Sequence, residues 1–242
     1  MGAFSESLTT AVGLVVSGDA GLWAVVGRSL SVSVISSLLA CGVGLLLGAW
    51  LGVSSFKGRG ALITVLNTFL AVPSVVVGLV VYLLLSRSGP LGWLGWLFSF
   101  QAMVLAQTAL VLPLVVALSR QAIEDAERQH GEQLASLGAS RWMRALLLAW
   151  DERYALLTVM ITAFGRAISE VGAVMIVGGN IEGFTRVMTT AIALETSKGD
   201  LPLALGLGLV LLGVVLLLNA LVSVVRRWRE RVDGGVPEAV PA

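Results

Sequence analysis

Residues 120–153 read RQAIEDAERQHGEQLASLGASRWMRALLLAWDER and form the one long polar segment of an otherwise apolar chain. Apolar residues recur among the charges at about helical spacing, at Ile123, Ala126, Leu134 and Leu137. Gly138 can end a helix in the left-handed conformation, and Ser140 can accept the first amide hydrogen bonds of the next helix. The pattern predicts two short helices that meet at a fixed elbow. A second interpretation is a pair of amphipathic helices lying on a bilayer.

The composition around this segment is that of a membrane protein. The chain has 242 residues, of which 57% are hydrophobic and 13% charged, with a mean hydropathy of +0.92. Soluble domains are close to half apolar and about a quarter charged. The net charge of +1 leaves no basic footprint for nucleic acid. The single Cys41 excludes an intrachain disulfide, and with the lone His130 it indicates no metal cluster.

Five apolar segments are long enough to cross about 30 Å of hydrocarbon, and we predict the spans 29–53, 61–86, 102–119, 155–177 and 202–225. Residues 1–28 form an N-terminal segment whose first helix is amphipathic and too short to cross, so we expect it to lie in the membrane interface. It has no basic region or cleavage site typical of a signal peptide. Residues 29–225 form the transmembrane domain, and residues 226–242 a cytoplasmic tail of Gly, Pro and charge that we expect to be disordered after Trp228.

Residues in and beside the spans predict how the helices pack, bend and begin. In the first, small residues recur every four positions and predict close approach of another helix, at Ser36, Ala40, Gly44, Gly48 and Gly52. Pro73 predicts a kink in the second span, because it frees a backbone carbonyl. Asp200 is placed to cap the last helix.

The fourth span carries the charges Arg166 and Glu170, with Ser169 nearby. The two charges are four residues apart and can pair on one helical face. Because an unpaired charge in the bilayer costs about 2.5–3.5 kcal/mol, such residues normally face a bundle interior or a water-filled path. The sequence leaves three roles open: a gate or pathway element, a structural ion pair, or a substrate contact.

The distribution of basic residues predicts how the chain is oriented across the membrane. One side collects eleven of them, which are Lys57, Arg59, Arg120, Arg128, Arg141, Arg144, Arg153, Arg226, Arg227, Arg229 and Arg231. The other side receives four, which are Arg28, Arg87, Arg186 and Lys198. This split places the first group in the cytoplasm, the N-terminus outside and the C-terminus inside.

The decapeptide 132–141, EQLASLGASR, resembles the cytoplasmic coupling motif of ABC-importer permeases. Gln133-Leu134 stand where the family has two alanines, and Trp150-Asp151 where it has Leu-Pro. The resemblance implies that a helix here sits in a groove of the ATP-hydrolysing subunit. It assigns coupling to Glu132, Leu134, Ala135, Gly138, Ala139, Ser140 and Arg141.

Residues 164–200, together with the segment 72–78, resemble permeases of the molybdate/tungstate/sulfate group, and most of all tungstate permeases. The resemblance implies an all-α integral membrane protein of the type I ABC importer permease fold with five transmembrane helices, in the cell inner membrane. The candidate pathway or gate residues are Pro73, Arg166, Ser169, Glu170, Gly172, Gly178, Gly179 and Asn180, and a purely structural kink at Pro73 stays open as the alternative. The partners that the resemblance implies are a second copy of the chain, two cytoplasmic ATPases, an extracytoplasmic oxyanion-binding protein and membrane lipid.

The chain lacks a phosphate-binding Gly-x-x-x-x-Gly-Lys-Ser/Thr loop, so ATP and Mg²⁺ are expected on a partner ATPase and no cofactor on this chain. No catalytic constellation occurs in the spans, so a membrane enzyme is disfavoured. Tungstate is the predicted cargo, with molybdate or sulfate as alternatives. An ion-coupled secondary transporter using Arg166 and Glu170 is the alternative class, but the chain has no internal repeats typical of such transporters.

Overall fold

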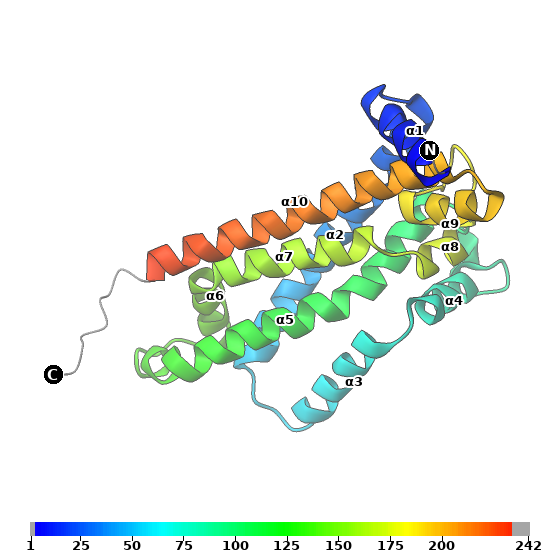
Figure 1. Cartoon of the computed structure of the whole chain (residues 1–242). Coiled ribbons are helices and arrows are strands. Elements are labelled where there is room, and N and C mark those ends of the chain that lie inside the picture. The colour runs from blue at the N-terminus through cyan, green and yellow to red at the C-terminus, as the bar shows by residue number, and fades with distance from the viewer. Residues whose placement is uncertain (1–2, 234–242) are drawn as a thin grey trace.

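The fold is built on two long helices, α2 (Ala20–Val53) and α5 (Phe100–Ser136), which pack against each other along their length (Figure 1). The structure is a computed structural model that describes residues 3–233. The remaining elements are α1 (Ala3–Val16), α3 (Arg59–Ala71), α4 (Ser74–Leu85), the 3-10 turn η1 (Gly92–Leu94), α6 (Arg141–Asp151), α7 (Arg153–Ile168), α8 (Gly172–Gly178), α9 (Met188–Lys198) and α10 (Leu201–Asp233). All regular structure in this part of the chain is helical.

The predicted small-residue face of α2 is confirmed, because α5 lies against it. A Cβ atom added to Gly44 would lie 2.8 Å from Val115 Cγ1, and one added to Gly48 would lie 1.8 Å from Ser119 Oγ. Without side chains at these positions the two helices approach closely, which is how helices gain contact energy in lipid.

Within the described residues, three helices are long and apolar enough to cross a membrane by themselves: α2, α5 and the 201–225 part of α10. Two further spans are bent pairs, α3 with α4 and α7 with α8, so the bundle has up to five spans. The first pair turns by 100° at Pro73, a sharper break than the kink that the sequence predicts. The second pair turns by 57° at residues 169–171, a bend that the sequence does not predict.

Some element boundaries differ from the predicted spans. Asp19 accepts a 2.8 Å hydrogen bond from Leu22 N, so α2 begins at Ala20 and takes in part of the predicted N-terminal segment. The polar segment after residue 119 extends α5 to Ser136 and is not a separate short helix, because residues 121–130 include no Gly or Pro. Helix α10 continues to Asp233, and the rest of the predicted tail, 234–242, lies outside the described residues.

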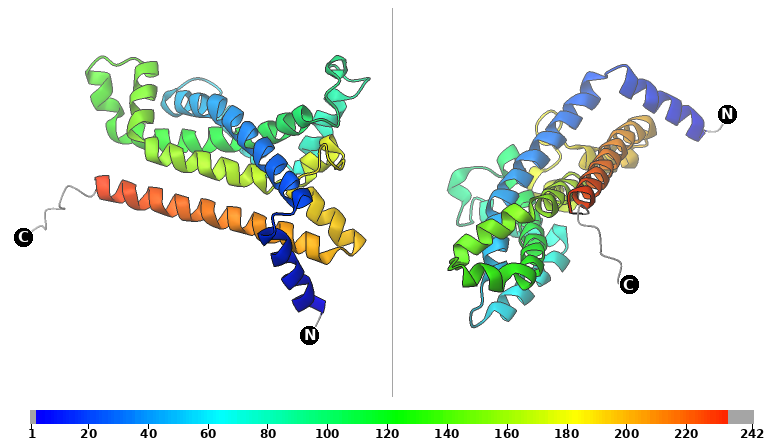
Figure 2. Two further views of the ribbon diagram at one scale, coloured as in Figure 1. Left: turned by 90° about the horizontal axis from the view of Figure 1, so that it is seen from above. Right: turned by 90° about the vertical axis from the view of Figure 1, so that its left-hand side faces the viewer.

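The two ends of the bundle carry different features. At one end of the bundle α1 lies across the start of α10, and α8 and α9 are at the same end; at the opposite end α5 turns into α6 (Figures 1 and 2). Arg28, at the α1 end, donates hydrogen bonds to the carbonyls of Gly183 (2.7 Å) and Arg186 (3.2 Å). Asp200 caps α10 as predicted, with a 3.2 Å hydrogen bond from Leu203 N.

Candidate functional site: a coupling elbow and a broken membrane helix

The elbow between α5 and α6 is fixed by backbone hydrogen bonds. Gly138 has a φ of +80°, and its N–H donates to Ala135 O while Ala139 N–H donates to Leu134 O, both at 3.0 Å. This pair of bonds is the Schellman motif, which closes a helix C-terminus. Ser140 then accepts a 3.3 Å hydrogen bond from Met143 N and caps α6. The helix end at Gly138 and the cap at Ser140 are therefore as the sequence predicts.

Helix α6 has one buried and one exposed apolar face. Ala145 and Leu148 are buried and pack on residues of α2, α5 and α7, including Val53, Ile123 and Leu156. The opposite side exposes five large apolar side chains, which are Trp142, Met143, Leu146, Leu147 and Trp150. An amphipathic helix whose apolar face points outward, held on a rigid turn, is suited to fit a groove in another protein.

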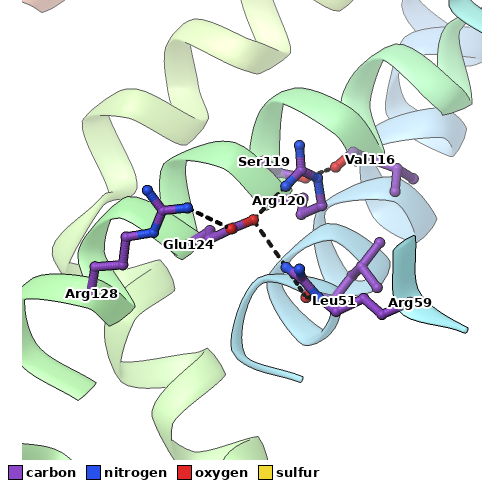
Figure 3. Close-up of polar contacts among 7 residues, drawn as sticks. All are labelled: Leu51, Arg59, Val116, Ser119, Arg120, Glu124 and Arg128. Atoms are coloured by element: carbon purple, nitrogen blue, oxygen red, sulfur yellow. Dashed lines mark hydrogen bonds and ion pairs between the residues drawn. The ribbon is translucent and has the colours of Figure 1, made fainter. Parts of the chain in front are cut away.

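Ion pairs lock this end of the bundle. Arg144 pairs with Glu127 across the elbow, with Nη1 to Oε1 at 2.6 Å. Glu124 gathers Arg59 at 3.0 Å and Arg128 at 2.9 Å and also binds Arg120 (Figure 3). Because Arg59 begins α3 and also donates to Leu51 O at the end of α2, the cluster ties three helices together.

The arginines change the acidity of Glu124. Burial by itself raises the pKa of its carboxyl group, but hydrogen bonds from Arg59 and Arg128 and the charges of Arg59 and Arg120 outweigh that effect. The pKa of Glu124 therefore lies below its ordinary value, and the carboxylate stays charged at neutral pH.

The predicted coupling residues all lie on the elbow. Glu132, Ala135, Gly138, Ser140 and Arg141 are exposed, whereas Leu134 and Ala139 are half-buried. Arg141 donates a 3.4 Å hydrogen bond to Ser55 O, which joins the elbow to the loop between α2 and α3. The ion pairs of Glu124 and Glu127 were not predicted from the sequence, because their arginine partners come partly from distant segments.

The second candidate site surrounds Glu170, which lies in the break between α7 and α8. Its side chain is 2% exposed, and its Oε2 lies 2.7 Å from Arg166 Nη1. Oε1 accepts a 3.0 Å hydrogen bond from Ala173 N, and the Ser74 side chain also hydrogen-bonds to the carboxylate. The Glu170 carbonyl accepts a 2.6 Å bond from Thr189 Oγ1. The carboxylate is thus paired by the predicted partner, although α7 ends at Ile168 and the two charges are not on one continuous helix.

Helices α4 and α8 meet closely beside this carboxylate. A Cβ atom on Gly172 would lie 2.7 Å from Val75 Cγ2, and one on Gly78 would lie 2.7 Å from Ala173 Cα. Pro73 is the N-cap residue of α4, next to Ser74. The structure therefore brings Pro73, Arg166, Glu170 and Gly172 together where the two bent spans touch.

Of the other predicted pathway residues, Ser169 lies next to Glu170 in the break, whereas Gly178, Gly179 and Asn180 lie at the other end of α8. The Ser169 hydroxyl is exposed and donates to the carbonyls of its own helix, Gly165 (3.0 Å) and Arg166 (3.2 Å). Gly178 and Gly179 end α8 as predicted, with Gly179 at a φ of +69°. Asn180 follows with a φ of +51° and donates to Thr190 O at 3.3 Å. These three residues are at the far end of α8 from Glu170.

Gln107 is a buried residue of this region that the sequence analysis did not identify. It is 3% exposed, donates a 2.9 Å bond to Ala167 O, and accepts a 3.1 Å bond from Ser36 Oγ. It joins α2, α5 and the last turn of α7, one residue before that helix ends. The sequence feature that could have identified Gln107 is its amide side chain, which lies among the apolar residues of the predicted span 102–119.

Among the described residues no group of three or more His, Cys, Asp or Glu side chains could hold a metal ion. A helical membrane bundle with an exposed apolar helix on a rigid elbow at one end, and a paired charge in a broken span, is the arrangement expected of the membrane subunit of a transporter. The chain belongs to the family of binding-protein-dependent transport system inner membrane components, whose family model matches residues 44–231.

Three relatives are similar to this chain. A probable anion ABC transporter permease protein of Haloferax volcanii is 45% identical over 174 residues, covering 70% of this chain and 74% of the relative. The tungstate uptake system permease protein of Peptoclostridium acidaminophilum is 40% identical over 218 residues, covering 90% and 96%. That of Campylobacter jejuni is 42% identical over 161 residues, covering 66% and 67%.

The chain is thus a multi-pass permease subunit of an ABC importer and not itself an enzyme. Membership of this family implies an ATPase and a binding protein as partners. The family resemblance, the fold class and the transport function predicted from the sequence are confirmed.

Proposed function

We propose that this chain is the permease of a tungstate importer. The observation that carries the cargo is the 40% identity to the tungstate permease of Peptoclostridium acidaminophilum, which extends over 90% of this chain. Molybdate and sulfate are the alternative cargoes, since both are tetrahedral dianions like tungstate. The binding protein selects among them before the permease meets the anion.

Coupling is proposed to use the elbow. The exposed apolar face of α6 fits a groove in a cytoplasmic ATPase, and the Schellman turn at Gly138 transmits rigid motion into α5. ATP and Mg²⁺ bind on that partner, and this chain binds no cofactor. The contact surface is the predicted set Glu132, Leu134, Ala135, Gly138, Ala139, Ser140 and Arg141, extended by the apolar residues of α6.

The pathway is proposed to lie between two copies of the chain, each with its own ATPase, in contact with membrane lipid. The break around Glu170 acts as the gate, because two bent spans meet there and groups from several helices hold Glu170 through its carboxylate and its backbone carbonyl. Rocking of the spans exposes the path to each side in turn. Segment 178–195 lies on the outer side near the binding protein, and the elbow lies in the cytoplasm.

The test is tungstate uptake into proteoliposomes that contain this chain, its ATPase and its binding protein. We expect uptake that requires all three components and ATP, with tungstate preferred over molybdate and sulfate. Preference for another oxyanion would change the assigned cargo to that anion and leave the assignment as an ABC importer unchanged. Uptake by this chain alone under an ion gradient would instead establish the secondary transporter, with Arg166 and Glu170 as its site.

A further inference from the structure

A polar cavity of about 460 Å³ lies at the elbow end of the bundle. Its charged lining consists of Arg59, Arg128, Arg141, Arg144, Glu124 and Glu127. These side chains come from the first residue of α3, from α5 and from the first turn of α6. The cavity lies between the loop that follows α2 and the elbow itself, and Figure 3 shows the Glu124 side of it.

The lining carries more positive than negative charge. Four arginines face two glutamates, and a fifth arginine, Arg120, also binds Glu124. The carboxylate of Glu124 is already shared among three guanidinium groups. Glu127 binds Arg144 through Oε1, while its Oε2 has no hydrogen-bond partner and adds negative charge to the wall.

Two of the arginines have donors to spare. Arg141 makes one long hydrogen bond, 3.4 Å to Ser55 O, and no ion pair within the described part of the chain. The Nε atom of Arg144 is buried without a hydrogen-bond partner. A guanidinium group presents five donors in a planar fork, so the weakly engaged Arg141, together with the other arginines that line the cavity, favours an anion with several oxygen atoms.

Helix ends and membrane position favour the same ligand. Helices α3 and α6 both begin at residues that line the cavity, and helix N-termini carry partial positive charge. The cavity lies next to the end of the apolar helix α2 and to the charged part of α5, and basic pockets between helices at such ends bind the phosphate groups of lipids.

We propose that this cavity is a binding site for a phosphate group, supplied by the headgroup of an anionic phospholipid or by free phosphate. The bound group bridges Arg141 and Arg144 of the elbow to Arg59 and Arg128. It thereby offsets the surplus positive charge and holds α6 against the loop after α2. The site is separate from the proposed cargo path, and its test requires no transport.

The experiment measures binding to the purified full-length chain. Dioleoyl phosphatidylglycerol is titrated into the protein and its binding is followed by native mass spectrometry, with the zwitterionic dioleoyl phosphatidylcholine as the comparison. Binding of inorganic phosphate is measured by calorimetry. We expect saturable binding of one molecule of phosphatidylglycerol or of phosphate per chain. Saturation by the lipid alone assigns the site to headgroups, and saturation by free phosphate assigns it to soluble anions.

The variants Arg128→Gln and Arg141→Gln each remove one guanidinium group and leave Glu124 paired with Arg59 and Arg120. Each is expected to weaken binding about fivefold. The matched control is Arg153→Gln, which removes an exposed charge at the same end that stacks on Trp150 and Tyr154 and does not line the cavity. Binding of neither probe, or an equal loss in the Arg153 variant, would overturn the proposal. Melting temperatures establish that each variant is folded.

Discussion

Charged and polar side chains in this protein are stabilised by partners that lie close along the chain in some cases and far along it in others. The pair of Arg166 and Glu170 follows from a spacing of four residues and was predictable from the sequence. Gln107 was not, because its main partner is the carbonyl of Ala167, 60 residues away. The Arg59 to Glu124 pair joins residues 65 apart and was missed for the same reason. Local chemistry is readable from spacing, and long-range pairing depends on the packing of the bundle.

Replacing Glu170 tests whether its charge serves transport. Glu170→Gln keeps the size of the side chain and an oxygen for Ala173 N, while the half-exposed Arg166 can still be solvated. We expect normal amounts of membrane-inserted protein and an uptake rate lowered about tenfold, which corresponds to about 1.4 kcal/mol. Transport assays and quantitative blots on the same membranes measure both, with Glu6→Gln as a control on the exposed N-terminal helix. Loss of detectable protein would make the pair structural.

The Glu124 cluster should respond to acid. Since its folded pKa lies below the unfolded value, its stabilisation is complete above the ordinary glutamate pKa of about 4.3 and is lost as the pH falls through the folded pKa. We expect Glu124→Gln to lower the melting temperature by a constant amount from pH 7 to about pH 5. The difference should shrink in more acidic buffer. A difference that already disappears between pH 7 and pH 5 would contradict the assignment.

At the scale of elements, helix ends follow from residues beside them in the chain. Ser140, Gly138, Gly179 and Asp200 all act where the sequence analysis expected, because caps are made by near neighbours. The bend angles could not be predicted. They depend on contacts such as that of Gly78 in α4 with Ala173 in α8, two helices that are separated along the chain by α5, α6 and α7.

The contact between α2 and α5 gives a matched glycine pair. Gly48→Ala would place a methyl group 1.8 Å from Ser119 Oγ and 2.9 Å from Arg120 N, so the helices must separate. We expect a loss of about 1–3 kcal/mol of stability, typical of overpacking. Gly42→Ala, on the same helix, meets no atom within 4 Å and should be neutral or stabilising. Unfolding measurements in detergent compare the two, and equal effects would argue against close α2 to α5 packing.

The elbow between α5 and α6 provides a second matched pair of glycine substitutions. Gly138 and Gly58 both have positive φ, +80° and +91°, and open space around the position of a Cβ atom. Aspartate tolerates this conformation better than most residues, so both Gly138→Asp and Gly58→Asp should fold and insert. We expect only Gly138→Asp to lose ATP-driven uptake and co-purification with the ATPase, because only that change adds charge and bulk to the coupling surface. Normal transport by this variant would exclude the elbow from coupling.

At the scale of the whole molecule, the number of spans was predictable and their shapes were not. Hydropathy locates five apolar segments, but two of them are bent pairs whose geometry needs the neighbouring helices. The predicted orientation rests on the distribution of arginine and lysine, which places the two ends of the bundle on opposite sides of the membrane.

Labelling of single cysteines tests that orientation. In a Cys41→Ala background, Ser88→Cys and Ser136→Cys each place one thiol at an exposed position, before η1 and at the end of α5 respectively. We expect a membrane-impermeant maleimide to label position 88 in intact cells and position 136 only after permeabilisation. The reverse pattern would invert the protein in the membrane.

The arrangement around Glu170 also bears on how the chain enters the bilayer during synthesis. Two of its charge-stabilising partners, Arg166 and the N–H of Ala173, belong to the same stretch of chain. The ion pair can therefore form while that stretch is leaving the translocation machinery, without contact to any other helix. A nascent segment that carries both charges partitions into lipid as a neutral unit, whereas a lone glutamate would have to wait in water for a partner.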